Sequence, residues 1–250
     1  MKSRLLATFV TVILLGAAGA AAGSVGVPVP PDGGTLLVGF EEEGTRQEVD
    51  GEILGSTAYL GRVAWRVRAP LTFALLVGGS EVDVESAVHG KTTDFEGRAK
   101  LAVGAGASWI GPALGKGLHL FADMSALHVL SEGETNFQTT IQSSVFREEY
   151  YNRYSWTDFR IGGGVRWEAG PLIPYAGFLG RALDGNVSRE TYQTGQLVVD
   201  ETEDFSRGFL FYALGGVEYW LSESFLVRVT ASARGSDDYA WTVGIAELGF

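Results

Sequence analysis

The sequence predicts an all-β protein: an antiparallel, up-and-down transmembrane β-barrel of about ten strands, with eight strands as the alternative. Three observations predict this fold. Charged and apolar residues alternate along strand-like segments, the connections between these segments alternate between short and long, and tryptophans gather near the segment ends. Beyond the N-terminal segment no apolar run is long enough for a spanning helix, so any membrane crossing would use strands.

The N-terminal residues are typical of a cleaved export signal. Lys2 and Arg4 supply positive charge, the run from Leu5 to Leu15 is apolar, and small residues suited to cleavage follow. A retained N-terminal anchor is the alternative. We expect three segments: a signal peptide at 1–22, a short periplasmic segment at 23–33 and the barrel at 34–250.

Composition excludes several classes of function. The formal net charge is −11, whereas a protein that binds nucleic acid needs an excess of Lys and Arg. There is no cysteine, so neither disulfides nor thiolate metal sites can form. The acidic run from Asp200 to Asp204 lacks the ligand spacing of a calcium loop. We therefore expect no metal and no cofactor.

Strand-like segments with a period of two residues recur along the chain. In the segment 155–168, for example, Asp158 and Arg160 fall on one face while Phe159 and Ile161 fall on the other. The predicted strands lie near 34–43, 53–67, 71–82, 95–109, 118–130, 155–168, 172–183, 208–220, 224–234 and 239–250.

If the apolar faces contact lipid, the charged faces line the interior. Charges removed from bulk water need partners, so a cross-strand network of ion pairs is expected there. A barrel of about ten strands is close to the size at which side chains fill the interior. The predicted interior charges are Arg62, Arg66, Glu96, Arg98, Lys100, Asp123, Asp158, Arg160, Arg166, Glu168, Glu218, Arg228, Arg234 and Glu247.

The connections differ systematically in length. Those after the second, fourth, sixth and eighth strands are short: "RAP", "GPALGKG", "EAGPL" and "LSES". The others are long and polar, including "EEEGTRQEVDGE", "VESAVHGKTTD" and the stretches 131–154 and 184–207, and only "GSDD" at 235–238 departs from the pattern. This layout is typical of bacterial outer-membrane barrels, whose long loops face outside. We expect these acidic loops to contact any extracellular ligand.

The tryptophans are predicted to form two aromatic girdles at the membrane surfaces. Four of them end a strand just before a short connection, and two lie near the opposite strand ends. The predicted girdle residues are Trp65, Trp109, Trp156, Trp167, Trp220 and Trp241.

The last strand carries a further signal. Ala246, Leu248 and the final residue Phe250 share one face, and this pattern resembles the C-terminal signal of the bacterial outer-membrane β-barrel superfamily. The match weakens upstream, where Tyr239 and Trp241 lie on the other face. The resemblance implies location in the outer membrane, recognition by the barrel assembly machinery, and contact with outer-membrane lipid and lipopolysaccharide. No subfamily is identified.

Two other interpretations remain open at this point. A secreted, soluble barrel of lipocalin type would turn its apolar face inward. A barrel-embedded hydrolase would need a catalytic set, and the sequence contains neither an Asp-x-His nor a His-x-Ser motif. His119, Asp123 and Ser125 share one face, but the first two are about 13 Å apart along a strand, too far for a triad. We expect a non-enzymatic barrel with a charge-lined, filled interior, with a narrow pore as the alternative and a hydrolase third.

Overall fold

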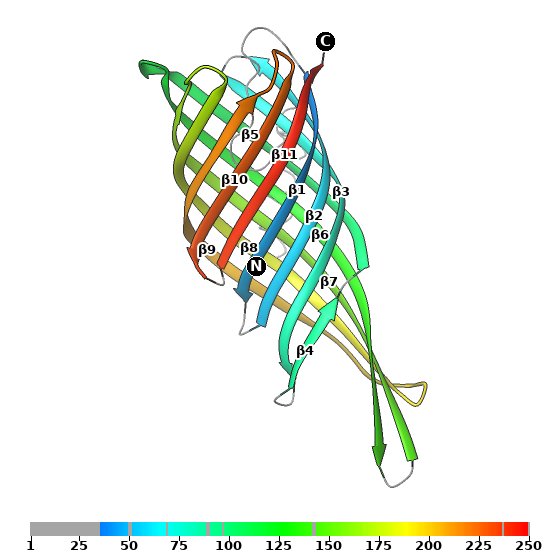
Figure 1. Cartoon of the computed structure of the whole chain (residues 1–250). Helices are drawn as coiled ribbons and strands as arrows, with labels where there is room; N and C mark the ends of the chain where they lie inside the picture. The colour runs from blue at the N-terminus through cyan, green and yellow to red at the C-terminus, as the bar shows by residue number, and fades with distance from the viewer. Residues whose placement is uncertain are drawn as a thin grey trace.

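The computed structural model describes residues 36–49, 52–68, 70–88, 91–96, 98–141, 144–236 and 238–249. All of its elements are strands (Figure 1). The predicted signal peptide, the segment 23–33 and Phe250 lie outside these residues. The strands are β1 (Leu36–Val49), β2 (Glu52–Arg68), β3 (Leu71–Val88), β4 (Lys91–Glu96), β5 (Arg98–Gly115), β6 (Leu118–Ile141), β7 (Ser144–Trp167), β8 (Leu172–Gln193), β9 (Gln196–Trp220), β10 (Phe225–Gly235) and β11 (Asp238–Gly249).

The strands form one closed antiparallel ring. Apart from β4 and β5, which do not pair with each other, each strand pairs with its neighbours in sequence. β1 pairs with β11 from Leu36↔Gly249 to Arg46↔Tyr239, which closes the barrel. β4 and β5 occupy a single place in the ring, because both pair with β3. The ring therefore has ten places, and the predicted up-and-down barrel of ten strands is confirmed.

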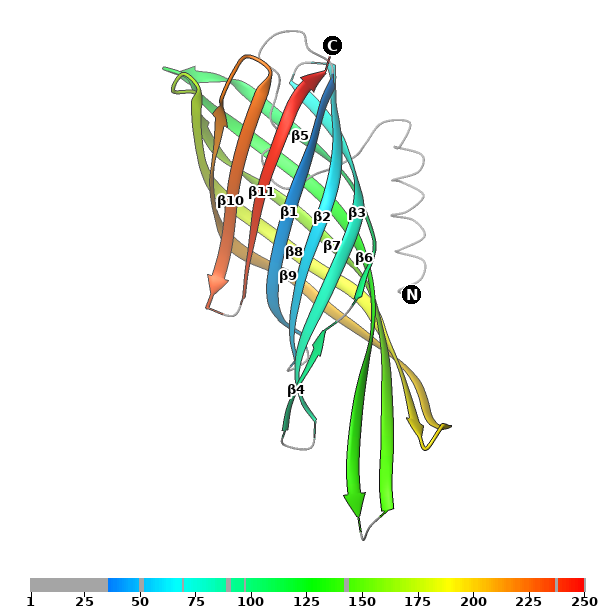
Figure 2. The same ribbon diagram turned by 45° about the vertical axis from the view of Figure 1, so that its right-hand side comes forward.

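Two hairpins extend far beyond the barrel wall on the side away from the C-terminus (Figure 2). β6 and β7 stay paired as far as Ile141↔Ser144, and β8 and β9 as far as Gln193↔Gln196. The prediction of long loops at 131–154 and 184–207 is therefore wrong: the described residues of these stretches continue the strands, apart from the turn at Thr194 and Gly195. The stretch "EEEGTRQEVDGE" is likewise mostly strand, because Glu41 to Val49 belong to β1. The polar residues of these stretches still form strands that pair with their neighbours. Polarity of the sequence alone does not separate such strands from loops.

We call the two ends of the barrel the terminal end, where β1 begins and β11 ends, and the hairpin end. Towards the terminal end, the outer surface is apolar. Phe178 and Phe211 are 70 % and 71 % exposed, which would be unfavourable in water and is favourable against lipid. The same surface includes Val38, Phe40, Leu75, Val77, Leu101, Met124, Ile161, Val165, Val229, Val243 and Ile245. This exposed belt makes the fold a transmembrane β-barrel rather than a soluble one.

No helix among the described residues is long and apolar enough to cross a membrane.

Towards the hairpin end, the pattern reverses. The interior there is an apolar cluster that includes Leu54, Leu60 and Trp156, while Glu81 and Asp83 are exposed on the outer surface. This section resembles a soluble barrel, because its outer surface carries charged residues and its inner surface is largely apolar. The charged part of the interior lies within the section that carries the apolar belt.

Candidate functional site

The candidate site is the charged interior of the belted section. Glu41 of β1 accepts hydrogen bonds at Oε2 from Arg62 Nη1 of β2 at 3.0 Å and from Arg228 Nη2 of β10 at 2.7 Å. All three side chains are buried. One carboxylate thus holds two guanidinium groups that approach from both sides of β1.

A second cluster joins opposite walls of the barrel. Arg160 of β7 donates to Glu43 of β1 through both terminal nitrogens, with Nη1 2.7 Å from Oε2. The Arg160 Nε also donates to Asp158 Oδ2 at 2.9 Å, and Arg181 Nη2 of β8 donates to the same oxygen at 2.5 Å. In the ring, β1 and β7 are five places apart, so the pair Arg160–Glu43 crosses the whole interior.

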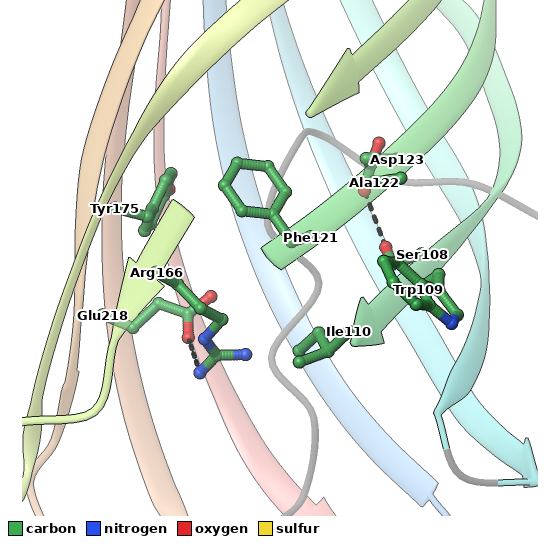
Figure 3. Close-up of a pocket in the computed structure, with 9 residues that line it drawn as sticks. All are labelled: Ser108, Trp109, Ile110, Phe121, Ala122, Asp123, Arg166, Tyr175 and Glu218. Carbon is green, nitrogen blue, oxygen red and sulfur yellow. Dashed lines mark hydrogen bonds and ion pairs between the residues drawn. The ribbon is translucent and has the colours of Figure 1, made fainter. Parts of the chain in front are cut away.

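A third group lies nearer the terminal end (Figure 3). Arg166 Nη2 donates to Glu218 Oε2 at 3.2 Å, and Ser108 Oγ donates to Asp123 Oδ2 at 2.6 Å. Figure 3 shows both pairs around a cavity of about 10 Å³, which is about the volume needed for one water molecule.

Among the residues whose burial the structure describes, the buried charges balance. They are five arginines and five carboxylates: Arg62, Arg160, Arg166, Arg181 and Arg228, with Glu41, Glu43, Asp123, Asp158 and Glu218. Ion pairs such as Arg62–Glu41, Arg160–Glu43 and Arg166–Glu218 withstand burial because opposite charges meet and share hydrogen bonds. Within the described residues, no three His, Asp or Glu side chains come together as metal ligands.

Several predicted interior charges do lie inside. The buried ones are Arg62, Asp123, Asp158, Arg160, Arg166, Glu218 and Arg228, and Arg66 is half-buried. Glu96 belongs to β4, and its side chain is outside the described part of the structure.

The prediction is wrong for five others, which are exposed: Arg98, Lys100, Glu168, Arg234 and Glu247. A register shift between Ala99 and Ala102 in β5 changes which side the preceding residues face. Glu168 follows the end of β7. Arg234 lies near the end of β10, with its Nη1 3.5 Å from Asp238 Oδ2. On β11 the inward residues are the even ones, so Glu247 points out.

Three interior charges were missed by the sequence reasoning: Glu41, Glu43 and Arg181. The two glutamates lie in a stretch that its polarity marked as loop, although Leu37, Glu41 and Glu43 share one parity. Arg181 shares its parity with Leu179 and Leu183, so that face looked apolar. A strict period of two, extended through the polar stretch, would have found the glutamates.

The predicted aromatic girdles are corrected in part. Trp109 and Trp167 are exposed at the terminal end, and Trp65 lies on the same outward face, with its ring centroid 6.1 Å from that of Phe73. Trp241 lies outward over Gly44. Trp156 and Trp220 were placed wrongly: Trp156 is buried in the apolar interior, and Trp220 packs against the interior cluster of Leu37 and its neighbours.

The predicted C-terminal signal also changes face. Ala246 is buried and packs inside against Leu37, while Val243 and Ile245 form the exposed face of β11. The expectation that Ala246 faces lipid is therefore wrong. Leu248 of β11 pairs with Leu37 of β1, and Phe250 lies outside the described residues.

The groups weighed for catalysis take structural partners. The Nδ1 of His119 lies 3.0 Å from the Gly111 carbonyl oxygen, and Asp123 accepts a hydrogen bond from Ser108. The Nδ1 of His128 lies 3.1 Å from the Thr157 hydroxyl.

A closed ring of ten antiparallel strands, an outer apolar belt and a charged interior together define an outer-membrane type of β-barrel. Three solved structures are similar to this chain in overall fold. The translocator domain of the autotransporter NalP from Neisseria meningitidis has a TM-score of 0.49 at 14 % identity, covering 87 % of this chain and 89 % of that one. The attachment invasion locus protein Ail of Yersinia pestis has a TM-score of 0.31 at 7 % identity (85 % and 94 % covered). The KdgM porin has a TM-score of 0.27 at 9 % identity, and the match covers 86 % of this chain and 99 % of that one.

No protein-family model matches the chain, and no curated protein matches it by sequence. At these low TM-scores, the assignment of the class rests on the strand pairing and outer surface of this chain itself.

Proposed function

We propose that this chain is a non-enzymatic protein of the bacterial outer membrane, with an interior closed by ion pairs and with hairpins that make contacts outside the cell. The observation that carries the proposal is the buried pair Arg160–Glu43. It joins walls that face each other across the ring, at a level enclosed by the apolar belt. Solutes passing along the axis would have to break it.

The spaces beside the ion pairs support a closed interior. Those next to Glu218, Glu41 and Arg160 measure about 10, 10 and 20 Å³. A single water needs about 10–15 Å³, so each of these spaces has room for an isolated water and not for a hydrated path. At the hairpin end, Val49, Leu54, Tyr154 and Val187 line a wider cavity of about 470 Å³, so the proposed barrier lies at the ion pairs.

The surface supports the proposed location in the outer membrane and the proposed contacts of the hairpins. The belt suits a bilayer, and the predicted export signal is consistent with the outer membrane. On the β8–β9 hairpin, Asp200, Glu201 and Asp204 are exposed, where an extracellular partner could reach them.

Conductance across a planar bilayer tests the closed interior. The purified full chain should insert and give no large, steady current, because the central ion pairs occupy the axis. A stable open current in every insertion would establish the narrow pore instead. Turnover of phospholipid or peptide substrates by the same preparation would establish the embedded hydrolase.

A further inference from the structure

We propose that a groove on the outer surface of β5, β6, β7 and β8 binds the phosphorylated sugar headgroup of a lipid in the surrounding leaflet. The groove has a volume of about 240 Å³ and opens just beyond the apolar belt on the hairpin side. The inference rests on the membrane location proposed above, but not on whether the interior conducts.

A row of paired residues forms the floor of the groove. Arg98 of β5 pairs with Glu132 of β6, Glu132 with Arg153 of β7, and Arg153 with Ser188 of β8. Directly paired residues project from the same face of a sheet, so these four side chains stand side by side. Ser131 and Tyr154, the neighbours of this row, are buried inside, which places the row on the outer face.

Lys100 joins the row because of the register shift in β5. Its Nζ forms an ion pair with Glu132 Oε1, and Arg153 Nε lies 3.8 Å from Glu132 Oε2. The hydrogen bond from Lys100, together with the charges of Lys100, Arg153 and Arg98, lowers the pKa of Glu132 despite a smaller opposing effect of desolvation. Three cations thus surround one carboxylate in a chain with a net charge of −11.

The chemistry of this row fits phosphate. Arginine binds phosphate through paired N–H donors, and Arg98 and Arg153 flank the same point of the groove. Arg153 has a side chain that is 67 % exposed, so it can turn to a ligand without breaking a buried contact.

The next row of the groove offers partners for a sugar. Tyr151 of β7 pairs with Glu190 of β8, and the ring of Tyr151 stands edge-on to Tyr192 with centroids 5.5 Å apart. Tyr192 donates to Glu190 at 3.0 Å, which leaves the second carboxylate oxygen available as an acceptor. Ser188 and Glu190 can therefore bond sugar hydroxyls beside a phosphate held by the arginines.

The height of the groove identifies the ligand as a lipid. Between Arg98 and Trp109 of the terminal-end girdle, β5 rises roughly 28 Å, at about 3.3 Å a residue and a tilt of about 40°. This is just beyond an apolar band of about 25 Å. Leu101, directly below Lys100 on the same strand, is 52 % exposed and belongs to the belt. A ligand with its headgroup at Arg98 would lay its acyl chains over Leu101.

Binding of a defined lipid tests the proposal. The purified full chain in a neutral detergent is titrated with lipid A that carries both phosphates, with the same lipid after dephosphorylation, and with glucosamine 1-phosphate. We expect at least tenfold tighter binding of the phosphorylated lipid than of either other probe. The double variant Arg98→Gln/Arg153→Gln should weaken binding of the phosphorylated lipid by about tenfold or more.

Arg189→Gln is the matched control. Arg189 lies on β8 opposite Asn152, one row from Arg153, but on the other face of the sheet, where it pairs with Glu203 at 2.7 Å. We expect the Arg189→Gln variant to bind the phosphorylated lipid as tightly as the wild type does. All variants should show the same gel shift on heating, which indicates a folded barrel. Unchanged binding by the double variant, or an equal loss in Arg189→Gln, would overturn the site. Equal affinity for glucosamine 1-phosphate and the lipid would overturn the assignment to a lipid.

Discussion

Arg160 and Glu43 form a buried, bidentate ion pair, although 117 residues separate them in the chain. They lie on β7 and β1, which face each other across the ring of strands. Asp158 and Arg181 extend the pair along the wall of β7 and β8. A cluster that touches both sides of the barrel couples the stability of the fold to the closure of its interior.

Arg160→Ala should strongly destabilise the barrel. The change leaves Glu43 without the partner shown here and removes one of the two arginines on Asp158. Breaking a buried pair by removing one partner costs about 3–5 kcal/mol, because the remaining charge stays buried. The free energy of unfolding, measured by denaturant titration in lipid vesicles, checks this expectation.

Arg189→Ala serves as the control for that measurement, because its pair with Glu203 is exposed and should contribute about 0–1 kcal/mol. A loss in Arg160→Ala no larger than in this control would mean that water reaches the interior. That result would also weaken the proposal of a closed interior.

The hairpin end should face outside the cell. Protease added to intact cells should cut near the tips of the β6–β7 and β8–β9 hairpins, for example at Thr194 and Gly195, where the φ angles are positive and the chain turns. The turn at Lys116 and Gly117 should be cut only after the outer membrane is opened. Mass spectrometry of the released peptides locates the cuts, and cleavage confined to Lys116 in intact cells would reverse the topology.

Gly177→Ala should destabilise the barrel. Gly177 pairs with Gly164, and a Cβ at Gly177 would collide with the Gly163 carbonyl group and with Gly164 Cα. The β7 and β8 backbones would have to separate, at a cost of about 1–3 kcal/mol. Ala176→Val, next in the chain but exposed on the outer surface, should change stability by about 0.5 kcal/mol or less. Equal effects of the two changes on denaturant unfolding would contradict the close approach.

Phe250→Asp should impair assembly in cells more than folding in vitro. The prediction rests on the resemblance of the C-terminal residues to the signal read by the barrel assembly machinery. Loss of the burial of one aromatic side chain costs only about 1–3 kcal/mol. The variant should accumulate unfolded in the periplasm, yet refold in detergent with the heat-dependent gel shift of a barrel. Wild-type levels of assembled variant in the outer membrane would refute the signal.

The sequence by itself determined the class of fold. A period of two residues is a local property of a strand, so alternation in segments such as 155–168 and 224–234 was enough to predict ten strands and most of their inward faces. The short connections near Lys116 and Glu168 could also be predicted from the sequence, because tight turns have local sequence signals. The buried side chains of Arg62, Arg160 and Arg228 followed from parity alone.

The tertiary structure decided what parity could not. The acidic stretch of β1 looked like a loop, and only the arginines of β2, β7 and β10 make Glu41 and Glu43 tolerable inside. A register shift turned Arg98 and Lys100 outward, and the parity of β11 turned Ala246 inward. Which cation meets which carboxylate depends on closure of the ring, because β1 and β7 become neighbours only across the interior. Sequence fixes the direction of each side chain along its own strand, but partners on opposite walls are set by the curvature and register of the whole barrel.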